Sequence, residues 1–252
     1  MNQISKLLSR PIAHRGFHNA DDGVIENTPS AISAAVAGNF AIEVDVQETA
    51  DTEALVYHDY TLDRLVQGSG PVFQQISSDL VKLPMKTGTD TLWLLQDLFN
   101  LVNGKVPLVI ELKSRMVPGA QADFVRRVVD QVAGYNGLAC IKSFDPDMIS
   151  IARAHNPSVL RGIVAHGAHK GPDLLKFSRM ERFIQRNMLH IPRTRPHFIS
   201  YGIHDLPSSG PRFWRSVIGL PIMTWTVRTE QQRERAARYA DQIVFEGFNP
   251  DA

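Results

Sequence analysis

The sequence predicts an α/β protein, a distorted (β/α)₈ barrel of the TIM type. Three observations favour this fold. The chain has 252 residues, a length that suits one such barrel. Eight short β-rich runs are distributed along it, and segments with helical periodicity lie between them. Strands that alternate with helices form parallel sheets, and eight such units close into a barrel.

The expected strands are rich in apolar and β-branched residues. In chain order they are 11–15, 40–46, 106–112, 138–143, 159–164, 197–201, 221–227 and 242–246. The expected helices repeat apolar residues at helical spacing. They span 28–38, 92–102, 119–133, 146–155, 173–187, 211–218 and 229–239. A doubly wound open sheet is the alternative, but it usually has fewer strands, and the chain lacks the glycine-rich phosphate turn that often accompanies it.

One interval breaks the plain alternation. Residues 47–105 separate the second and third runs and contain an extra strand-like stretch at 54–58. The connection to that stretch is too short for a parallel crossover, which needs a dozen or more residues. We therefore expect an antiparallel hairpin that turns at 51–53, followed by a small insertion, within a single domain that covers residues 1–252.

The hairpin makes a geometric prediction about one histidine. Folding the two strands about Thr52 places His58 opposite Val46 and beside Asp45. The segment 61–86 then forms an excursion over one mouth of the barrel.

Composition narrows the function. The formal net charge is +1, which gives no reason to expect nucleic acid as a partner. The single cysteine, Cys140, excludes an intrachain disulfide and a cysteine metal cluster. No apolar run approaches the roughly 18 residues of a membrane span, and the N-terminal apolar stretch is too short for a secretory signal. We therefore expect a cytoplasmic protein without stable membrane insertion; its oligomeric state is left open.

Acidic residues collect at and after the second predicted strand. Seven lie between positions 43 and 63, without any Lys or Arg. Glu43 and Asp45 share one face of a strand, because side chains alternate with period two. Two carboxylates that point together into a barrel repel each other unless a positive group lies between them. This pair predicts metal binding or catalysis; a chance polar pair is the alternative.

A second charged pair, Glu111 and Lys113, ends the next predicted strand. Charged residues at the carboxyl end of a barrel strand lie where these folds place their chemistry. An internal ion pair is the alternative reading. With Glu43 and Asp45, Glu111 would complete a set of three carboxylates, which suits one divalent ion, Mg²⁺ or Ca²⁺.

His14, Arg15 and Gly16 follow the first predicted strand at the equivalent position. The guanidinium of Arg15 suits phosphate oxygens, and His14 can transfer a proton near neutral pH. Gly16 allows a sharp turn with its backbone close to a ligand.

Several short motifs occur together and in order. They read IAHRG at 12–16, ENTP at 26–29, IEVDV at 42–46, VYHD at 56–59, LDR at 62–64, IELK at 110–113, SFDP at 143–146 and WTV at 225–227. As a set they resemble the glycerophosphodiester phosphodiesterase family, within the phospholipase C-like phosphodiesterase barrels, over nearly the whole chain. Any single motif is much less specific.

The resemblance implies that the protein hydrolyses glycerophosphodiesters, as small-molecule substrates, to sn-glycerol 3-phosphate and an alcohol. By the same resemblance, Glu43, Asp45 and Glu111 would hold the metal ion, and His14 and His58 would be the acid–base pair. The resemblance further implies that phosphate or substrate is bound by Arg15, Lys113, Asn27 and Trp225. It also implies that Glu26 and Glu246 support the site. Relatives often have Thr-Asp where this chain has Phe245-Glu246.

Two other functions remain open at this point. A related barrel acting on lysophospholipids, or one that stops at a cyclic phosphate, would carry much the same residues. A non-catalytic barrel that binds phosphate esters would tend to lose a proton-transfer group or a metal ligand. This chain retains both histidines and all three carboxylates. The leaving alcohol, the choice between Mg²⁺ and Ca²⁺, and which histidine is the acid are left open.

Overall fold

The computed structural model describes residues 2–167 and 179–252. Nine strands are present in this part of the chain, and they match the eight predicted runs and the hairpin strand. They are β1 (Ile12–His14), β2 (Ala41–Glu48), β3 (Ala54–Val56), β4 (Leu108–Leu112), β5 (Ala139–Ser143), β6 (Leu160–Ala165), β7 (Phe198–Gly202), β8 (Ile222–Val227) and β9 (Gln242–Phe245).

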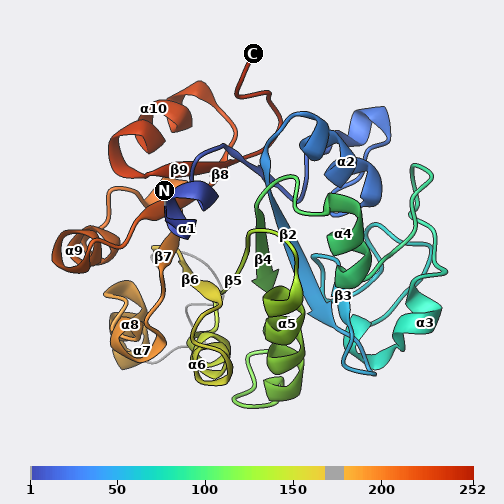
Figure 1. The fold of residues 1–252 in the computed structure, drawn as a ribbon, viewed down its shortest axis with the longest axis horizontal. Coiled ribbons are helices and arrows are strands. Elements are labelled where there is room, and N and C mark those ends of the chain that lie inside the picture. The colour runs from blue at the N-terminus through green and yellow to red at the C-terminus, as the bar shows by residue number, and fades with distance from the viewer. Residues whose placement is uncertain (1, 168–178) are drawn as a thin grey trace.

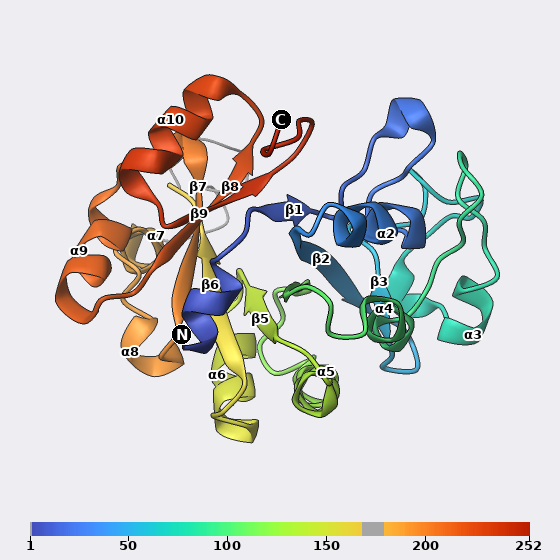
Figure 2. The same cartoon turned by 45° about the horizontal axis from the view of Figure 1, so that its top comes forward.

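Eight of these strands are parallel and form a closed barrel (Figures 1 and 2). Their order is β1, β9, β8, β7, β6, β5, β4 and β2, and the ring closes because β1 pairs with β2. The additional strand β3 pairs with β2 in antiparallel orientation. The predicted barrel is therefore confirmed, including the antiparallel hairpin after its second strand.

Helices surround the barrel. They are α1 (Gln3–Leu7), α2 (Pro29–Ala37), α3 (Ser77–Leu80), α4 (Leu95–Val102), α5 (Ala122–Gly134), α6 (Pro146–His155), α7 (Arg179–Arg186), α8 (Ile191–Thr194), α9 (Ser209–Ile218) and α10 (Glu230–Tyr239). The first part of the helix predicted at 173–187 lies outside the described residues. Among the described helices, none is both long enough and apolar enough to cross a membrane.

Side-chain caps fix where two of these helices begin. The hydroxyl of Thr28 accepts from the backbone of Ala31, and Pro29 occupies the first turn of α2, where its missing N–H costs nothing. Thr229 and Gln232 form a reciprocal capping box at the start of α10.

The strands bury both of their faces. On the outer face, Ile42, Val44 and Val46 of β2 belong to a large apolar cluster that includes residues of α2, α4 and α5. On the inner face, every strand of the barrel contributes one residue to an apolar floor, formed by Ile12, Ala41, Val109, Cys140, Leu160, Phe198, Met223 and Val244. Above this floor the inward residues of β2, β4 and β5 become charged.

Gly162 of β6 shows how closely this interior is packed. A Cβ atom at this position would lie 2.1 Å from the ring of Phe198, far inside contact distance. A glycine is therefore required here because the aromatic ring occupies the space of a side chain.

The predicted register of the hairpin is wrong by two residues. Val46 pairs with Val56 rather than with His58, so the hairpin folds about Asp51 and not about Thr52. The reason lies in the turn, where the hydroxyl of Thr49 accepts from the backbone N–H of Glu53 at 2.9 Å. This bond closes a loop whose central residue is Asp51.

His58 nevertheless lies near the carboxyl end of β2. The backbone N–H of Tyr57 donates to the carbonyl of Asp45 at 3.0 Å, which holds the next residue beside the barrel mouth. The side-chain amide of Gln47 also donates to the carbonyl of His58 at 2.8 Å. The predicted neighbourhood of His58 is thus confirmed by contacts other than the predicted strand pair.

The insertion after β3 lies on the flank of the barrel (Figures 1 and 2). It contains a 3₁₀ turn (Val72–Gln74) and α3, and it has a small apolar cluster of its own. That cluster consists of Ile25, Leu55, Tyr57, Leu62, Val66, Val72, Leu80, Met85 and Leu92. The insertion therefore packs on β3 and on the loop after β1.

Candidate active site

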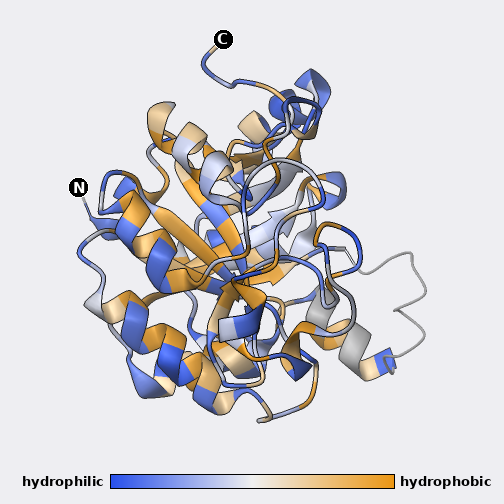
Figure 3. Ribbon diagram, turned by 90° about the vertical axis from the view of Figure 1, so that its right-hand side faces the viewer, coloured by the Kyte–Doolittle hydropathy of each residue, from blue (hydrophilic) through white to orange (hydrophobic). Residues whose placement is uncertain are grey.

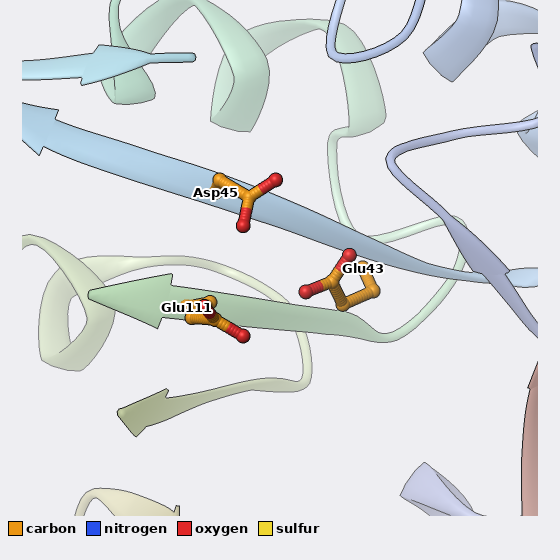
Figure 4. Close-up of side chains that lie close together, drawn as sticks. All are labelled: Glu43, Asp45 and Glu111. Carbon is orange, nitrogen blue, oxygen red and sulfur yellow. The ribbon is translucent and has the colours of Figure 1, made fainter. Parts of the chain in front are cut away.

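Three carboxylates lie together inside the carboxyl end of the barrel (Figure 4). Glu43 and Asp45 project from β2 and Glu111 from β4, and the two strands pair so that Asp45 is the register partner of Glu111. One oxygen atom of each carboxylate lies within 4.8 Å of the others. The side chains are almost completely buried, with 1–5% of each residue exposed. The sequence analysis predicted this cluster.

Two lysines, of which Lys142 is buried and Lys113 partly exposed, bridge the carboxylates. The Nζ atom of Lys113 lies 2.9 Å from Asp45 and 2.7 Å from Glu111. The Nζ atom of Lys142, on β5, lies 2.9 Å from Glu43 and 3.0 Å from Glu111. Glu111 is therefore shared between both ammonium groups.

Lys142 was missed by the sequence analysis. It is only 2% exposed, and it lies in a run that reads as an ordinary apolar strand. One signal was available: a lysine inside a predicted barrel strand, at the same inward parity as Cys140, must be neutralised by an acid on a neighbouring strand.

These charges determine the protonation of the cluster. Burial by itself would raise the pKa of Asp45, but the positive charges of Lys113 and Arg15, with smaller effects of both imidazoles, hold it well below its usual value. Burial likewise acts to raise the pKa of Glu111, yet Lys142 and Lys113 lower it overall. The pKa of Lys142 is raised because the two glutamates outweigh its burial. Asp45, Glu111, Lys113 and Lys142 are therefore ionised near neutral pH.

Arg15 and Asn27 attach the loop after β1 to this cluster. The Nε atom of Arg15 lies 3.3 Å from Asp45, and its Nη1 atom donates to Glu26 at 2.7 Å. The backbone N–H of Arg15 donates to Glu43 at 3.2 Å. The amide of Asn27 donates to Asp45 at 3.0 Å, so Asn27 holds a carboxylate of the cluster; its predicted contact with substrate stays a prediction.

His14 ends β1 and joins two carboxylates. Its Nδ1 atom lies 2.6 Å from Oε2 of Glu246, and its Nε2 atom lies 3.9 Å from Glu43. Glu246 in turn accepts from Arg228 at 2.9 Å. Burial would raise the pKa of Glu246, but His14 and Arg228 lower it to about 2. Glu246 is thus in contact with His14; its supporting role stays a prediction.

His58 has a similar arrangement on the other side of Arg15. Its Nδ1 atom lies 2.7 Å from Asp59, and Asp59 accepts from Nε of Arg64 at 2.5 Å. Arg64 also donates to Glu26 at 2.8 Å. A chain of ion pairs thus connects His58 to Arg15 through three side chains, of which Asp59 and Arg64 were not assigned roles from sequence.

Trp225 belongs to a separate aromatic wall. Its ring meets Phe144 edge-on with the centroids 5.5 Å apart, and Phe144 meets His166 at 6.0 Å. These residues come from β8 and from the ends of β5 and β6. Among the described contacts, those of Trp225 lead to Phe144 and to the barrel floor, whereas the other predicted site residues are linked to the carboxylates directly or through ion pairs.

The carboxylate cluster can bind a metal ion. Oxygen ligands at roughly 2.0–2.6 Å from one ion lie within about 5 Å of one another, and the three carboxylates meet this condition. The donor set consists of oxygen atoms, which hard divalent ions prefer. The residues present therefore fit such an ion.

The chain is similar to known phosphodiesterases. Residues 14–246 match the model of the glycerophosphoryl diester phosphodiesterase family. A glycerophosphodiester phosphodiesterase of Caldanaerobacter subterraneus subsp. tengcongensis is 35% identical over 127 residues, which cover 46% of this chain and 51% of that relative. The matched part thus spans about half the length of this curated relative.

Solved structures share the fold. An Oleispira antarctica phosphodiesterase in complex with the product sn-glycerol-3-phosphate has a TM-score of 0.74 at 17% identity, covering 93% of this chain and 91% of its own. A glycerophosphodiester phosphodiesterase from Parabacteroides distasonis has a TM-score of 0.73 at 22% identity, with coverage of 94% and 92%. At such identities the likeness concerns the fold.

The family match extends over most of the chain. It shows that the protein belongs to the glycerophosphoryl diester phosphodiesterase family, a family of phosphoric diester hydrolases, as its motifs predict.

Proposed function

We propose that the protein hydrolyses glycerophosphodiesters to sn-glycerol 3-phosphate and an alcohol, with a divalent ion held by Glu43, Asp45 and Glu111. The observation that carries this proposal is the convergence of two histidines, three carboxylates and two phosphate-compatible cations, Arg15 and Lys113, at one end of the barrel. The Oleispira antarctica phosphodiesterase, which has this fold, holds sn-glycerol-3-phosphate. That product contains the phosphate and glycerol that these groups would recognise.

The three carboxylates would hold Mg²⁺ or Ca²⁺ by their oxygen atoms. When bound, such an ion would neutralise charge that develops on the phosphoryl group and would lower the pKa of a nearby hydroxyl. Lys113 and Arg15 lie on the same carboxylates, so both would add positive charge beside the phosphate in the transition state.

The two histidines would move the protons. The 2-hydroxyl of glycerol attacks phosphorus while one imidazole removes its proton, and the bond from phosphorus to the alcohol oxygen breaks as the other imidazole protonates that oxygen. Water then opens the cyclic phosphate with the proton roles reversed. Because Nδ1 of each ring faces a carboxylate, Glu246 or Asp59, Nε2 is the atom that we assign to proton transfer in both.

The attack by a hydroxyl of the substrate itself is intramolecular, which removes part of the entropic barrier. We assign Trp225, with Phe144, to an apolar wall that packs against the glycerol carbons. Asn27 and Glu26 would act through the residues that they hold, Asp45 and Arg15.

The test is release of glycerol 3-phosphate from a panel of glycerophosphodiesters, followed by phosphorus NMR. Activity should disappear in excess chelator and return with Mg²⁺ or Ca²⁺. Replacing His14 or His58 by alanine should lower kcat by on the order of 10²–10⁴-fold. Near-full turnover in both histidine variants would contradict the acid–base roles, and unchanged turnover in chelator would contradict the metal site.

A further inference from the structure

We propose that Lys142 is an internal counter-ion that weakens the binding of the divalent ion and holds the carboxylates in place when the ion is absent. This inference rests on the metal site of the proposed function. It concerns a residue that the mechanism above does not use, and it states that this residue lowers the affinity of the site for its ion.

The position of Lys142 is fixed by the barrel itself. Lys142 is the register partner of Glu111 across β4 and β5, and its ammonium lies 3.0 Å from Glu111 and 2.9 Å from Glu43. One residue two positions earlier on the same face, Cys140, belongs to the apolar floor. The ammonium therefore lies between the floor and the carboxylates.

Lys142 differs in this respect from Lys113. The side chain of Lys113 is 13% exposed, against 2% for Lys142, and it follows the end of β4 at the mouth. Lys113 can turn toward a ligand that enters from solvent. Lys142 has apolar packing below it and acids above it, so it stays beside the carboxylates whatever occupies the mouth.

The consequence for ion binding follows from charge. An ion held by Glu43, Asp45 and Glu111 shares two of its three ligands with a fixed positive group. Like charges at such distances in a buried site repel strongly, so Lys142 lowers the affinity for the ion. In the absence of the ion, the same ammonium neutralises carboxylates whose burial without a partner would be costly.

The experiment compares Lys142→Met, which keeps the length of the side chain and removes its charge, with the unchanged protein. Isothermal titration with MgCl₂ and with CaCl₂ measures the dissociation constant of each ion. We expect binding to tighten by on the order of tenfold or more. A role in packing alone would leave the affinity unchanged or weaken it, so the sign of the change separates the two explanations.

Thermal unfolding supplies a second readout that does not depend on activity. Without ion, Lys142→Met should unfold at a lower temperature than the unchanged protein, and added ion should raise its Tm by the larger amount. Lys142→Gln should behave in the same way. If both variants fold only in the presence of the ion, the ion has replaced the ammonium and the proposal is supported; if neither folds even then, the proposal is overturned.

Arg161→Met is the matched control. Arg161 is also a buried cation, 5% exposed, on the neighbouring strand β6, but its guanidinium donates to backbone carbonyls of Thr194, Pro157 and Val159. Removing that charge should leave the ion affinity unchanged.

The outcomes distinguish this proposal from the proposed function. If the unchanged protein binds neither ion, the metal site itself fails. If it binds an ion and the folded Lys142→Met protein binds that ion with equal or lower affinity, the metal site stands and the role of Lys142 is refuted.

Discussion

The imidazole of His14 and the carboxylate of Glu246 are in contact, with Nδ1 and Oε2 2.6 Å apart. They lie far apart along the chain and meet because β1 pairs with β9 in the barrel. A carboxylate on Nδ1 keeps a proton on that atom and presents Nε2 to the substrate. Glu246 therefore orients the ring on which one of the proposed proton transfers depends.

Replacing Glu246 by glutamine should lower kcat by on the order of 10²-fold or more, because the neutral amide no longer fixes the tautomer and orientation of His14. KM should change much less. The measurement is steady-state hydrolysis of a glycerophosphodiester. Glu230→Gln, at a 72% exposed side chain that pairs with Arg233, is the control and should keep full activity. Equal activity of both variants would contradict the role of Glu246.

Arg64 should matter although it lies outside the carboxylate cluster. It connects Asp59, which faces His58, to Glu26, which faces Arg15. Arg64→Met should reduce kcat/KM by about tenfold or more, because two buried or half-buried acids lose their common partner. Arg126→Met, at a side chain of similar exposure that pairs with Asp123, should have no effect. A loss of the same size in both variants would point to a general effect of charge.

Asn27 should contribute to stability through Asp45. The side-chain amide of Asn27 donates to the carboxylate of Asp45 and accepts from the backbone N–H of Asp45. The backbone carbonyl of Asn27 accepts from the indole N–H of Trp93 at 2.8 Å. Asn27→Ala leaves buried polar groups of Asp45 without these bonds, so the free energy of unfolding should fall by about 1–3 kcal/mol. Urea unfolding measures the change. A difference within error would mean that the remaining cations satisfy Asp45.

Gly162→Ala should destabilise the barrel by about 1–3 kcal/mol, because the new methyl group overlaps the ring of Phe198. Gly134→Ala at the end of α5 is the control, since a Cβ there meets nothing within 4 Å. That second substitution should be neutral or slightly stabilising. Chemical unfolding of the two variants side by side tests both expectations.

Asp51 should make stability depend on pH in the acid range. It accepts from Ser77 of α3 at 2.7 and 2.9 Å and from Thr49 at 2.6 Å, which join the hairpin to the insertion. Although desolvation acts to raise it, these bonds lower the pKa of Asp51 from 3.8 to about 2. Its contribution is therefore complete above about pH 4 and is lost as the pH falls toward 2.

The measurement is thermal unfolding of Asp51→Asn and of the unchanged protein between roughly pH 5 and pH 2, a range that spans the titration of Asp51. The difference in Tm should shrink as the pH falls. Asp123→Asn, at an 88% exposed side chain, serves as the control and should show no such difference at any pH. A difference in Tm between Asp51→Asn and the unchanged protein that stays constant down to the lowest pH would contradict the prediction.

The sequence was sufficient for the barrel and for most of the site because both depend on local patterns. Most strands are buried on two faces and therefore read as short apolar runs, as in β4 and β5. Glu43, Asp45 and Glu111 interrupt such runs at inward positions, and parallel strands bring their carboxyl ends to one mouth.

What escaped prediction depends on distant or fine geometry. The register of the hairpin goes with hydrogen bonds between Glu53 and Thr49 in the turn, which a count of residues cannot reveal. Lys142 requires knowledge that β5 lies next to β4, so that its charge meets Glu111. The link through Arg64 requires the insertion to fold back toward the loop after β1.

Closure of the barrel between its first and last strands also has a consequence for synthesis of the protein. Glu246 follows His14 by 232 positions, so a nascent polypeptide lacks this dyad until β9 and the residue after it have been translated. Proteolytic removal of β9 would break the ring of strands and take the orienting carboxylate with it. The protein would then gain, or lose, its closed barrel and its catalytic activity together.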